Sequence, residues 1–420
     1  MRTHPLLANS LAAIIAFSLA GAASADEPNP YYIGASQALS YQTNVYASQF
    51  NPVNSGISTT SLVGGFDQPI GRQRVFASGN VGYNYYTDSA AKILNNTAYG
   101  LNAGLDWETI ERLSGTVRLT ANQSLANYNT SSAPTVPQKN IQNLEQAVLT
   151  AKYGITPQWS LDGGYAFHKV DYSAPSYAYQ EFTQNGVSLG VRYGQGSVLS
   201  LGLAYRANRA EFPHYRVNTG PATSGSDPYI ADHSNGRYVD FTAVWIPNGL
   251  STLDVRLSLS DITYDINQAA DFNGLTGELG WNYQVTGKLS TRLSFLVAPG
   301  TSATFFAFST SGPISVQNST LSKILQYSAT YSMTAKTTLT VSLGLVQNRY
   351  GKTTPSGTLY GTDLTPTVNL GFTYAPTRNS LLGCNAQYLR RSASQQAEAL
   401  GQSYPYSSGM FTCTGQILLQ

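Results

Sequence analysis

Beyond His4 near its start, the sequence contains three histidines, the residue type best suited to act as a general base in hydrolysis. His168 lies on a polar position of an alternating segment, and His214 and His233 fall in a polar stretch at 213–234. A hydrolase would need one of them beside a nucleophile, as in a Ser-His-Asp site. No G-x-S-x-G sequence, phosphate-binding loop or metal-ligand spacing accompanies them. We therefore expect no enzyme and no cofactor.

A second set of candidates consists of charged side chains on the polar positions of alternating segments. Arginines placed there could bind carboxylate or phosphate groups of a passing solute. The alternative is that they pair with carboxylates on neighbouring strands, for instance Arg256 with Asp240, and hold those strands together. We expect pairing to account for most of them. The candidates are Arg118, Arg192, Arg206, Asp240, Asp254, Arg256, Glu278 and Arg292.

The two cysteines, Cys384 and Cys413, lie on the apolar positions of the last two alternating segments. A hairpin folded about residues 398–399 places them opposite one another, where paired Cβ atoms are about 4.5–5.5 Å apart. An oxidising compartment permits disulfides. The sequence therefore predicts a structural Cys384–Cys413 bridge, and the alternative is two buried thiols.

The segments that carry these residues have an unusual composition. Only 11% of the 420 residues are charged, against about 25% in soluble globular proteins, yet the mean hydropathy is −0.18. Small and neutral polar residues replace the missing charges, together with 29 tyrosines. This composition suits strands with one face in lipid and one in water. The net charge of +2 gives no reason to expect a nucleic-acid partner.

From residue 30 onward, apolar and polar residues alternate with the period of a β-strand. The stretch 99–107 places Tyr, Leu, Ala, Leu and Trp on one face, and 113–121 repeats the pattern after a short charged break. We count about eighteen such segments, from Tyr31–Tyr46 to Tyr406–Gln420, and find no helical pattern. Aromatic residues gather near the segment ends, as they do at membrane interfaces.

The connections between segments alternate between short and long. Short ones, such as 109–112 and 334–336, are tight turns. The long ones, rich in Ser, Thr, Pro and Gly, are 128–140, 213–234, 302–318, 350–361 and 394–405. Outer-membrane barrels have this arrangement, with short periplasmic turns and long external loops. The predicted fold is therefore all-β, a transmembrane antiparallel up-and-down β-barrel of about 18 strands.

The first 25 residues predict a secretory signal peptide. Arg2 supplies a positive charge, residues 11–19 are apolar, and Ala23-Ser24-Ala25 forms an A-x-A cleavage site. The apolar run is shorter than the roughly 18 residues that a membrane-spanning helix needs. Cleavage would leave residues 26–420 as a single barrel domain in the outer membrane of a Gram-negative bacterium.

Two stretches resemble a known family. They are QPIGRQRVFASGNVGYNYYTDS at 68–89 and LNNTAYGLNAGLDWETIERLSGTVRL at 94–119. Both resemble the EpsL-type outer-membrane barrels of exosortase-associated exopolysaccharide clusters, grouped with the β-barrel porin 2 family, as does the ending CTGQILLQ at 413–420. These are strand and turn motifs and transfer no active site. The resemblance implies export of an extracellular polysaccharide, such as that of a biofilm, or a structural role in that machinery.

Three functions remain open. The leading hypothesis is a monomeric barrel for polysaccharide export, with the polysaccharide chain as cargo and periplasmic polysaccharide-export components as partners. The second is a general porin or solute-diffusion channel, and the third is a surface barrel whose loops bind other cells or phage without transport. Each would contact outer-membrane lipid and lipopolysaccharide. The apolar residues Phe305, Phe306 and Phe308 of loop 302–318 predict that this loop folds into the mouth and constricts the pore.

Overall fold

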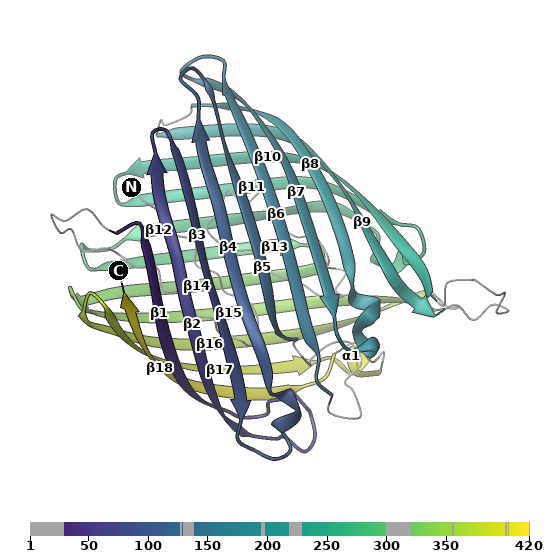
Figure 1. Ribbon diagram of the computed structural model, residues 1–420. Helices are drawn as coiled ribbons and strands as arrows, with labels where there is room; N and C mark the ends of the chain where they lie inside the picture. The colour runs from purple at the N-terminus through teal and green to yellow at the C-terminus, as the bar shows by residue number, and fades with distance from the viewer. Residues whose placement is uncertain are drawn as a thin grey trace, which may run out of the picture.

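Eighteen antiparallel strands form one closed sheet in the computed structural model of the chain (Figure 1). Consecutive strands pair with one another, and β1 also pairs with β18, which closes the barrel. The predicted fold class and strand number are confirmed. The structure describes residues 29–126, 128, 138–194, 198–217, 229–299, 321–354, 357–399, 401 and 403–419. The predicted signal peptide lies outside the described residues.

The bounds of the elements follow from the backbone pairing. The first nine strands are β1 (Tyr31–Gln42), β2 (Ser55–Ile70), β3 (Gln73–Tyr86), β4 (Asn96–Glu108), β5 (Leu113–Leu125), β6 (Ile141–Gly154), β7 (Trp159–Tyr172), β8 (Phe182–Tyr193) and β9 (Leu199–Val217). The other nine are β10 (Tyr229–Asn248), β11 (Ser251–Tyr264), β12 (Phe272–Gln284), β13 (Leu289–Ala298), β14 (Leu321–Thr334), β15 (Thr337–Thr354), β16 (Gly357–Thr377), β17 (Ser380–Ala393) and β18 (Tyr406–Leu419). The helical segments are η1 (Lys92–Leu94), η2 (Pro175–Gln180), η3 (Gln268–Ala270) and α1 (Gln395–Ala399). No helix among the described residues is long and apolar enough to cross a membrane.

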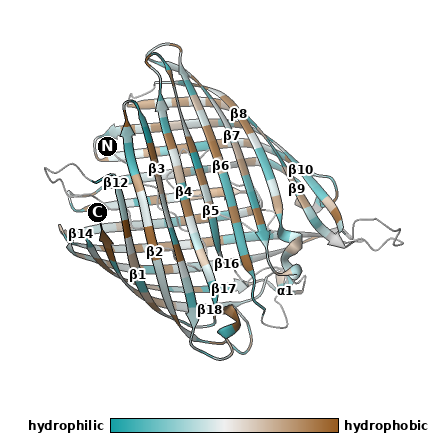
Figure 2. Cartoon of the chain, in the orientation of Figure 1, coloured by the Kyte–Doolittle hydropathy of each residue, from teal (hydrophilic) through white to brown (hydrophobic). Residues whose placement is uncertain are grey.

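Side chains alternate between the outer and inner faces of the barrel, because successive residues of a strand point to opposite sides. In β11, the outward Leu257 and Leu259 are 44% and 64% exposed, whereas the inward Arg256 and Ser258 are 6% and 1% exposed. Figure 2 shows the same alternation as hydrophobic and hydrophilic segments along the strands. A wall of exposed leucines is unfavourable in water and favourable in lipid. The chain is therefore a multi-pass β-barrel of the outer membrane.

The two ends of the barrel differ in their connections. The start of β1 and the end of β18 lie at the same end, opposite α1 (Figure 1). The connections at that end, which we take as periplasmic, are short turns such as the one between Thr334 and Thr337. The helical segments lie between strands at the other, extracellular end. This division is the one that the alternating connection lengths predict.

Strands extend into two of the predicted loops. The segment 350–361 was predicted to be a long loop, but β15 and β16 continue through it until Thr354 pairs with Gly357. The predicted loop 213–234 is likewise shortened by β9, which extends to Val217, and by β10, which begins at Tyr229. Both predictions were wrong for the same reason. Polar residues beyond the apolar band suggested loops, but backbone pairing with a neighbouring strand does not require apolar side chains.

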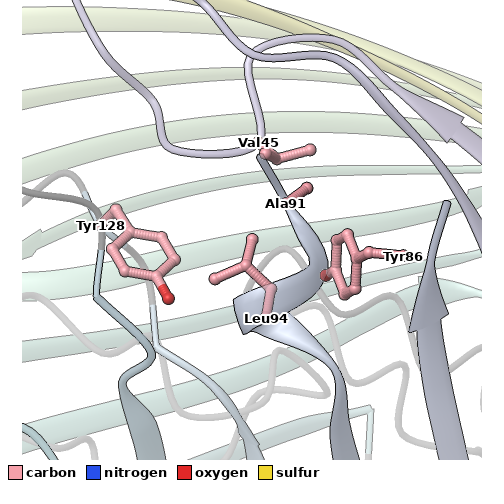
Figure 3. Close-up of a cluster of buried hydrophobic side chains, with 5 residues drawn as sticks. All are labelled: Val45, Tyr86, Ala91, Leu94 and Tyr128. Atoms are coloured by element: carbon pink, nitrogen blue, oxygen red, sulfur yellow. The ribbon is translucent and has the colours of Figure 1, made fainter. Parts of the chain in front are cut away.

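A small apolar cluster joins the extracellular ends of β1–β5 (Figure 3). Its buried members are Val45, Tyr86, Ala91, Leu94 and Tyr128. The ring of Tyr46 packs edge-on against Tyr128, with 5.5 Å between ring centroids. Burial raises the pKa of the Tyr128 phenol, so this side chain stays neutral. The cluster holds the loop after β1, η1 and the segment after β5 against one another.

The two cysteines occupy directly paired positions of β17 and β18. A disulfide joins Cys384 to Cys413, whose Cα atoms are 4.1 Å apart. Both cysteines share the outward face with Leu382 and Phe411, which are 51% and 53% exposed. The bridge therefore lies on the lipid-facing side of the last hairpin.

Candidate functional site

The candidate site is the inner wall of the barrel, which divides into two parts of different exposure. We call the part formed by β7–β13 the packed wall and the part formed by β14–β18 and β1–β6 the open wall. In the packed wall, the inward mid-strand side chains are buried: Tyr238, Asp240 and Arg256 are 2%, 5% and 6% exposed. In the open wall, most inward mid-strand side chains are half-buried. The open wall is therefore the more solvent-accessible part of the interior among the described residues.

The open wall consists mainly of hydroxyl and amide side chains. The alternation of β1, β3, β5 and β14–β17 places their polar residues inward, at half-buried positions such as Ser36, Ser78, Thr120, Gln326, Asn369 and Gln387. Some of these groups bond to one another, as Thr120 does when its hydroxyl donates to Asn102 Oδ1 at 3.1 Å. Each neutral group can also exchange hydrogen bonds with water or with a solute hydroxyl.

Every charged residue that the sequence analysis placed in the pore lies on the inner face and takes part in an ion pair. The pairs are Arg118 with Asp106, Arg192 with Asp162 at 2.7 Å, Arg206 with Asp240 at 2.9 Å, Arg256 with Glu278 at 3.8 Å and Arg292 with Asp254 at 3.7 Å. Arg256 forms its ion pair with Glu278, which lies directly opposite it in the strand register. The suggested partner Asp240, although near Arg256, pairs with Arg206. Pairing leaves these arginines poorly suited to capture an anionic solute.

The pair between Arg206 and Asp240 is the most completely enclosed of the five. Arg206 donates from Nε at 2.9 Å and from Nη2 at 3.1 Å to the two carboxylate oxygens of Asp240. Its guanidinium also lies 3.9 Å from the centroid of the Tyr238 ring. Both charged side chains are less than a tenth exposed. A bidentate bond of this kind is among the strongest that a carboxylate makes, so it stabilises the packed wall.

Gly280 makes room for another pair and was not identified from the sequence. It lies on the inner face of β12, between Asp254 on β11 and Arg292 on β13. A Cβ atom there would be 2.3 Å from Asp254 Oδ2 and 2.8 Å from Arg292 Nη2. A side chain at this position would push the carboxylate or the guanidinium aside. No sequence signal distinguishes Gly280 from the many other strand glycines.

Asp363 is a second residue that the sequence analysis missed, and it lies at the extracellular end of β16. Its buried carboxylate accepts hydrogen bonds from Asn348 Nδ2 at 3.0 Å, the Tyr350 hydroxyl at 2.7 Å and the Ser403 hydroxyl at 2.7 Å. Arg391 Nε lies 3.8 Å away. The network joins β15, β16, β17 and the segment before β18. It could have been predicted had 350–361 been recognised as two paired strands.

The histidines are not arranged as a catalytic site. His168 is 4% exposed and packs edge-on against Phe182, with 5.1 Å between ring centroids. His214 Nδ1 lies 2.7 Å from Glu181 Oε2, and His233 Nδ1 lies 3.6 Å from Asp265 Oδ2. His214 and His233 belong to β9 and β10, not to one solvated loop as predicted. Within the described ranges, no group of three or more His, Cys, Asp or Glu side chains could hold a metal ion.

The predicted plug residues Phe305, Phe306 and Phe308 lie outside the described residues. Their place in the mouth stays a prediction.

No protein-family model and no curated protein matches the sequence. Several solved outer-membrane proteins resemble the structure at low sequence identity. The outer-membrane protein OpdK from Pseudomonas aeruginosa is 14% identical, with a TM-score of 0.47 over 93% of this chain and 99% of that one. OccAB4 from Acinetobacter baumannii is 12% identical, with a TM-score of 0.45 over 93% and 99% of the two chains. The function of this chain is therefore inferred from its own residues.

Proposed function

We propose that this chain is a passive outer-membrane channel for small, uncharged hydrophilic solutes. The observation that carries the proposal is the open wall of hydroxyl and amide side chains inside a closed barrel of eighteen strands. Barrels of about this size leave room for an aqueous channel. The sequence alone favours polysaccharide export over a diffusion channel, and the open wall reverses this order.

Charge explains why the channel should favour neutral solutes. A pore that selects ions needs side chains of one sign facing the passing ion. Here, Arg206, Arg256 and Arg292 are each paired with a carboxylate on the packed wall. A neutral solute can instead replace its water hydrogen bonds with bonds to the open wall, which are individually weak enough to release it.

The experiment is reconstitution of the purified barrel in lipid vesicles and planar bilayers. We expect vesicle swelling with neutral sugars, at rates that fall as the sugar becomes larger, and little preference between potassium and chloride under a salt gradient. An empty vesicle and a vesicle holding a known closed barrel serve as controls. Absence of swelling, or a strong preference for one ion, would contradict the proposal.

Export of an extracellular polysaccharide is the second candidate. The stretches that resemble EpsL-type barrels, 68–89 and 94–119, contribute β3, β4 and parts of β2 and β5, which belong to the open wall. The same hydroxyl and amide groups are chemically suited to a glycan chain. A deletion strain that loses surface polysaccharide, together with a purified barrel that passes no free sugar, would favour export. Normal polysaccharide together with free sugar diffusion would favour the channel.

A further inference from the structure

The outward charges along the described strands lie near the extracellular end, and their signs are unevenly distributed. On β6–β11 the outward charged residues include both acids and bases. On β14–β17 they are the bases Lys323, Arg349 and Arg390, all exposed. We call these three residues the basic belt. Among the described outward residues of β14–β18 there is no Asp or Glu.

On the mixed side, the strand register places acids next to bases. Lys169 lies opposite Glu145 in the pairing of β6 with β7, and its Nζ is 2.8 Å from Asp171 Oδ2. Arg237 lies opposite Asp261 in the pairing of β10 with β11. The charges of this side are therefore largely compensated within the protein.

The basic belt has neutral residues at the same cross-strand positions. Lys323 pairs with Gln347, Arg349 with Thr362 and Arg390 with Ser407. The Arg349 guanidinium lies 3.9 Å from the centroid of the Tyr360 ring, which holds it against the outer surface. The carboxylate nearest along β16, Asp363, is buried on the inner face, where it is already bonded. The positive charge of the belt therefore faces outward.

The depth of the belt places it at the level of the lipid headgroups. Moving toward the membrane along each strand, the next outward apolar residues are Leu325 on β14, Leu345 on β15 and Tyr388 on β17. They are 42%, 38% and 54% exposed. Beyond the belt the next outward residues are Gly351 on β15 and Ser392 on β17, neither of which has an apolar side chain. The belt thus lies where the apolar band ends on the extracellular side.

The spacing of the belt suits more than one anionic group. Lys323 and Arg349 are diagonal neighbours in the register, so their Cα atoms are about 7–8 Å apart. Arg390 lies two strands away from Arg349 and four residues further along the strand direction. The spacing between strands and the rise per residue then put their Cα atoms about 16 Å apart. A single small anion would not contact all three side chains.

We propose that the basic belt binds the phosphate groups of lipopolysaccharide in the outer leaflet. Lysine and arginine form charge-assisted hydrogen bonds with phosphate, and basic clusters at a membrane surface recognise anionic headgroups. The acyl chains of the same lipid lie against Leu325 and Leu345, next to the belt. The site is independent of which solute the channel passes.

The test measures lipid bound to the intact, folded barrel by native mass spectrometry. The probes are bisphosphorylated lipid A and the same lipid with both phosphates removed. The test variant is Lys323→Gln/Arg349→Gln/Arg390→Gln, and the matched control from the mixed side is Lys169→Gln/Arg209→Gln/Arg237→Gln. Resistance of the folded barrel to SDS before heating shows that each variant has folded. A single variant, Arg390→Gln, provides a milder substitution if the triple variant does not fold.

We expect the belt variant to lose at least tenfold in affinity for bisphosphorylated lipid A, and the control variant to stay within twofold of the unmodified chain. Arg390→Gln should lie between them. Equal binding of the dephosphorylated lipid by the unmodified chain, or an equal loss in the two triple variants, would overturn the proposal. Displacement of the lipid by millimolar inorganic phosphate alone would also count against it, since the belt would then be a site for free phosphate.

Discussion

At the scale of single residues, the arginines that the sequence places on the inner wall each lie in an ion pair. The alternation in the sequence correctly indicates that Arg206 and Asp240 face inward. Successive residues of a strand point to opposite faces, so an odd or even position along the strand decides the face. It does not indicate their partners, because a partner depends on the register between strands. Arg256 illustrates the difference, since its cross-strand neighbour is Glu278 and not Asp240. Single substitutions in these pairs should therefore act mainly on stability.

Asp240→Asn should destabilise the barrel strongly. The substitution leaves the guanidinium of Arg206, which is 4% exposed, without its counter-charge, and breaking a buried pair in this way costs about 3–5 kcal/mol. The control is Asp106→Asn, which affects the more exposed pair with Arg118 and should cost less than about 1 kcal/mol. The measurement is urea unfolding of the folded barrel in lipid vesicles. Equal losses in the two variants would contradict the enclosed nature of the Arg206 pair.

Gly280→Ala should separate Asp254 from Arg292, because the new methyl group occupies the space in which they meet. Overpacking of this kind costs about 1–3 kcal/mol. Gly287→Ala is the matched control, since a Cβ atom there has no neighbour within 4 Å. The same unfolding measurement compares the two. A stability for Gly280→Ala equal to that of the control would show that the pair does not need the glycine.

At the scale of elements, the helix α1 and the disulfide both act on β16–β18 of the open wall, but α1 lies at the extracellular end and the disulfide lies within the membrane-facing part of the strands. The helix α1 packs against the inner face of β16 through Ala397, which is fully buried. The disulfide between Cys384 and Cys413 joins β17 to β18 on the opposite, outer face. The cysteine pairing could be proposed from the sequence, because both cysteines lie on apolar positions and a hairpin folded about residues 398–399 places them opposite one another. The position of α1 could not, because it depends on a contact with one glycine, Gly361.

Gly361→Leu should displace α1 from the inner wall. A Cβ atom at this position would be 2.5 Å from Ala397 Cα and 2.6 Å from Ala397 N, and neither backbone atom can move without moving the helix. We expect a loss of about 1–3 kcal/mol in stability and a higher single-channel conductance, since α1 lies inside the mouth. Gly344→Ala, whose Cβ atom would be at an ordinary 3.7 Å from Thr367, is the control. Conductance equal to the control would mean that α1 does not narrow the path.

Removal of the disulfide should weaken the closing hairpin. The bridge encloses a separation of 29 residues, and loop-closure entropy then predicts a loss of about 3–4 kcal/mol for Cys384→Ser/Cys413→Ser. Intact-mass measurement should show the unmodified chain lighter by two hydrogen atoms than the same chain after reduction. Free thiols under non-reducing conditions, or unchanged stability of the double variant, would contradict this.

At the scale of the whole molecule, the closed barrel could be predicted and the division of its interior could not. The period-two pattern, the low charge and the alternating connection lengths all follow from lipid on one face and water on the other. The contrast between the packed and open walls depends on packing inside the lumen, which leaves no period in the sequence. The resemblance of residues 68–89 and 94–119 to EpsL-type barrels favours polysaccharide export. The neutral side chains that line the open wall favour diffusion of small solutes.

Thr120→Arg should change the selectivity of the whole channel. It would place an arginine at a half-buried position of the open wall, beside Asn102 and two residues from Arg118, whose charge is already paired with Asp106. We expect the zero-current potential under a salt gradient to shift toward anion preference, because the new charge faces the aqueous path. Val244→Arg, on the inner face of β10, places the same charge on the packed wall and should shift the potential less. A larger shift for Val244→Arg would mean that the path runs along the other wall.

The position of the disulfide has a consequence for how this protein is made. Its two sulfur atoms share an outward face with Leu382 and Phe411, in the part of the wall that contacts acyl chains. A water-soluble thiol oxidase has no access to that depth once the barrel is in the membrane. The bond must therefore form while the C-terminal hairpin is still in the periplasm, before insertion. Oxidation precedes assembly, and the membrane then shields the finished bond from soluble reductants.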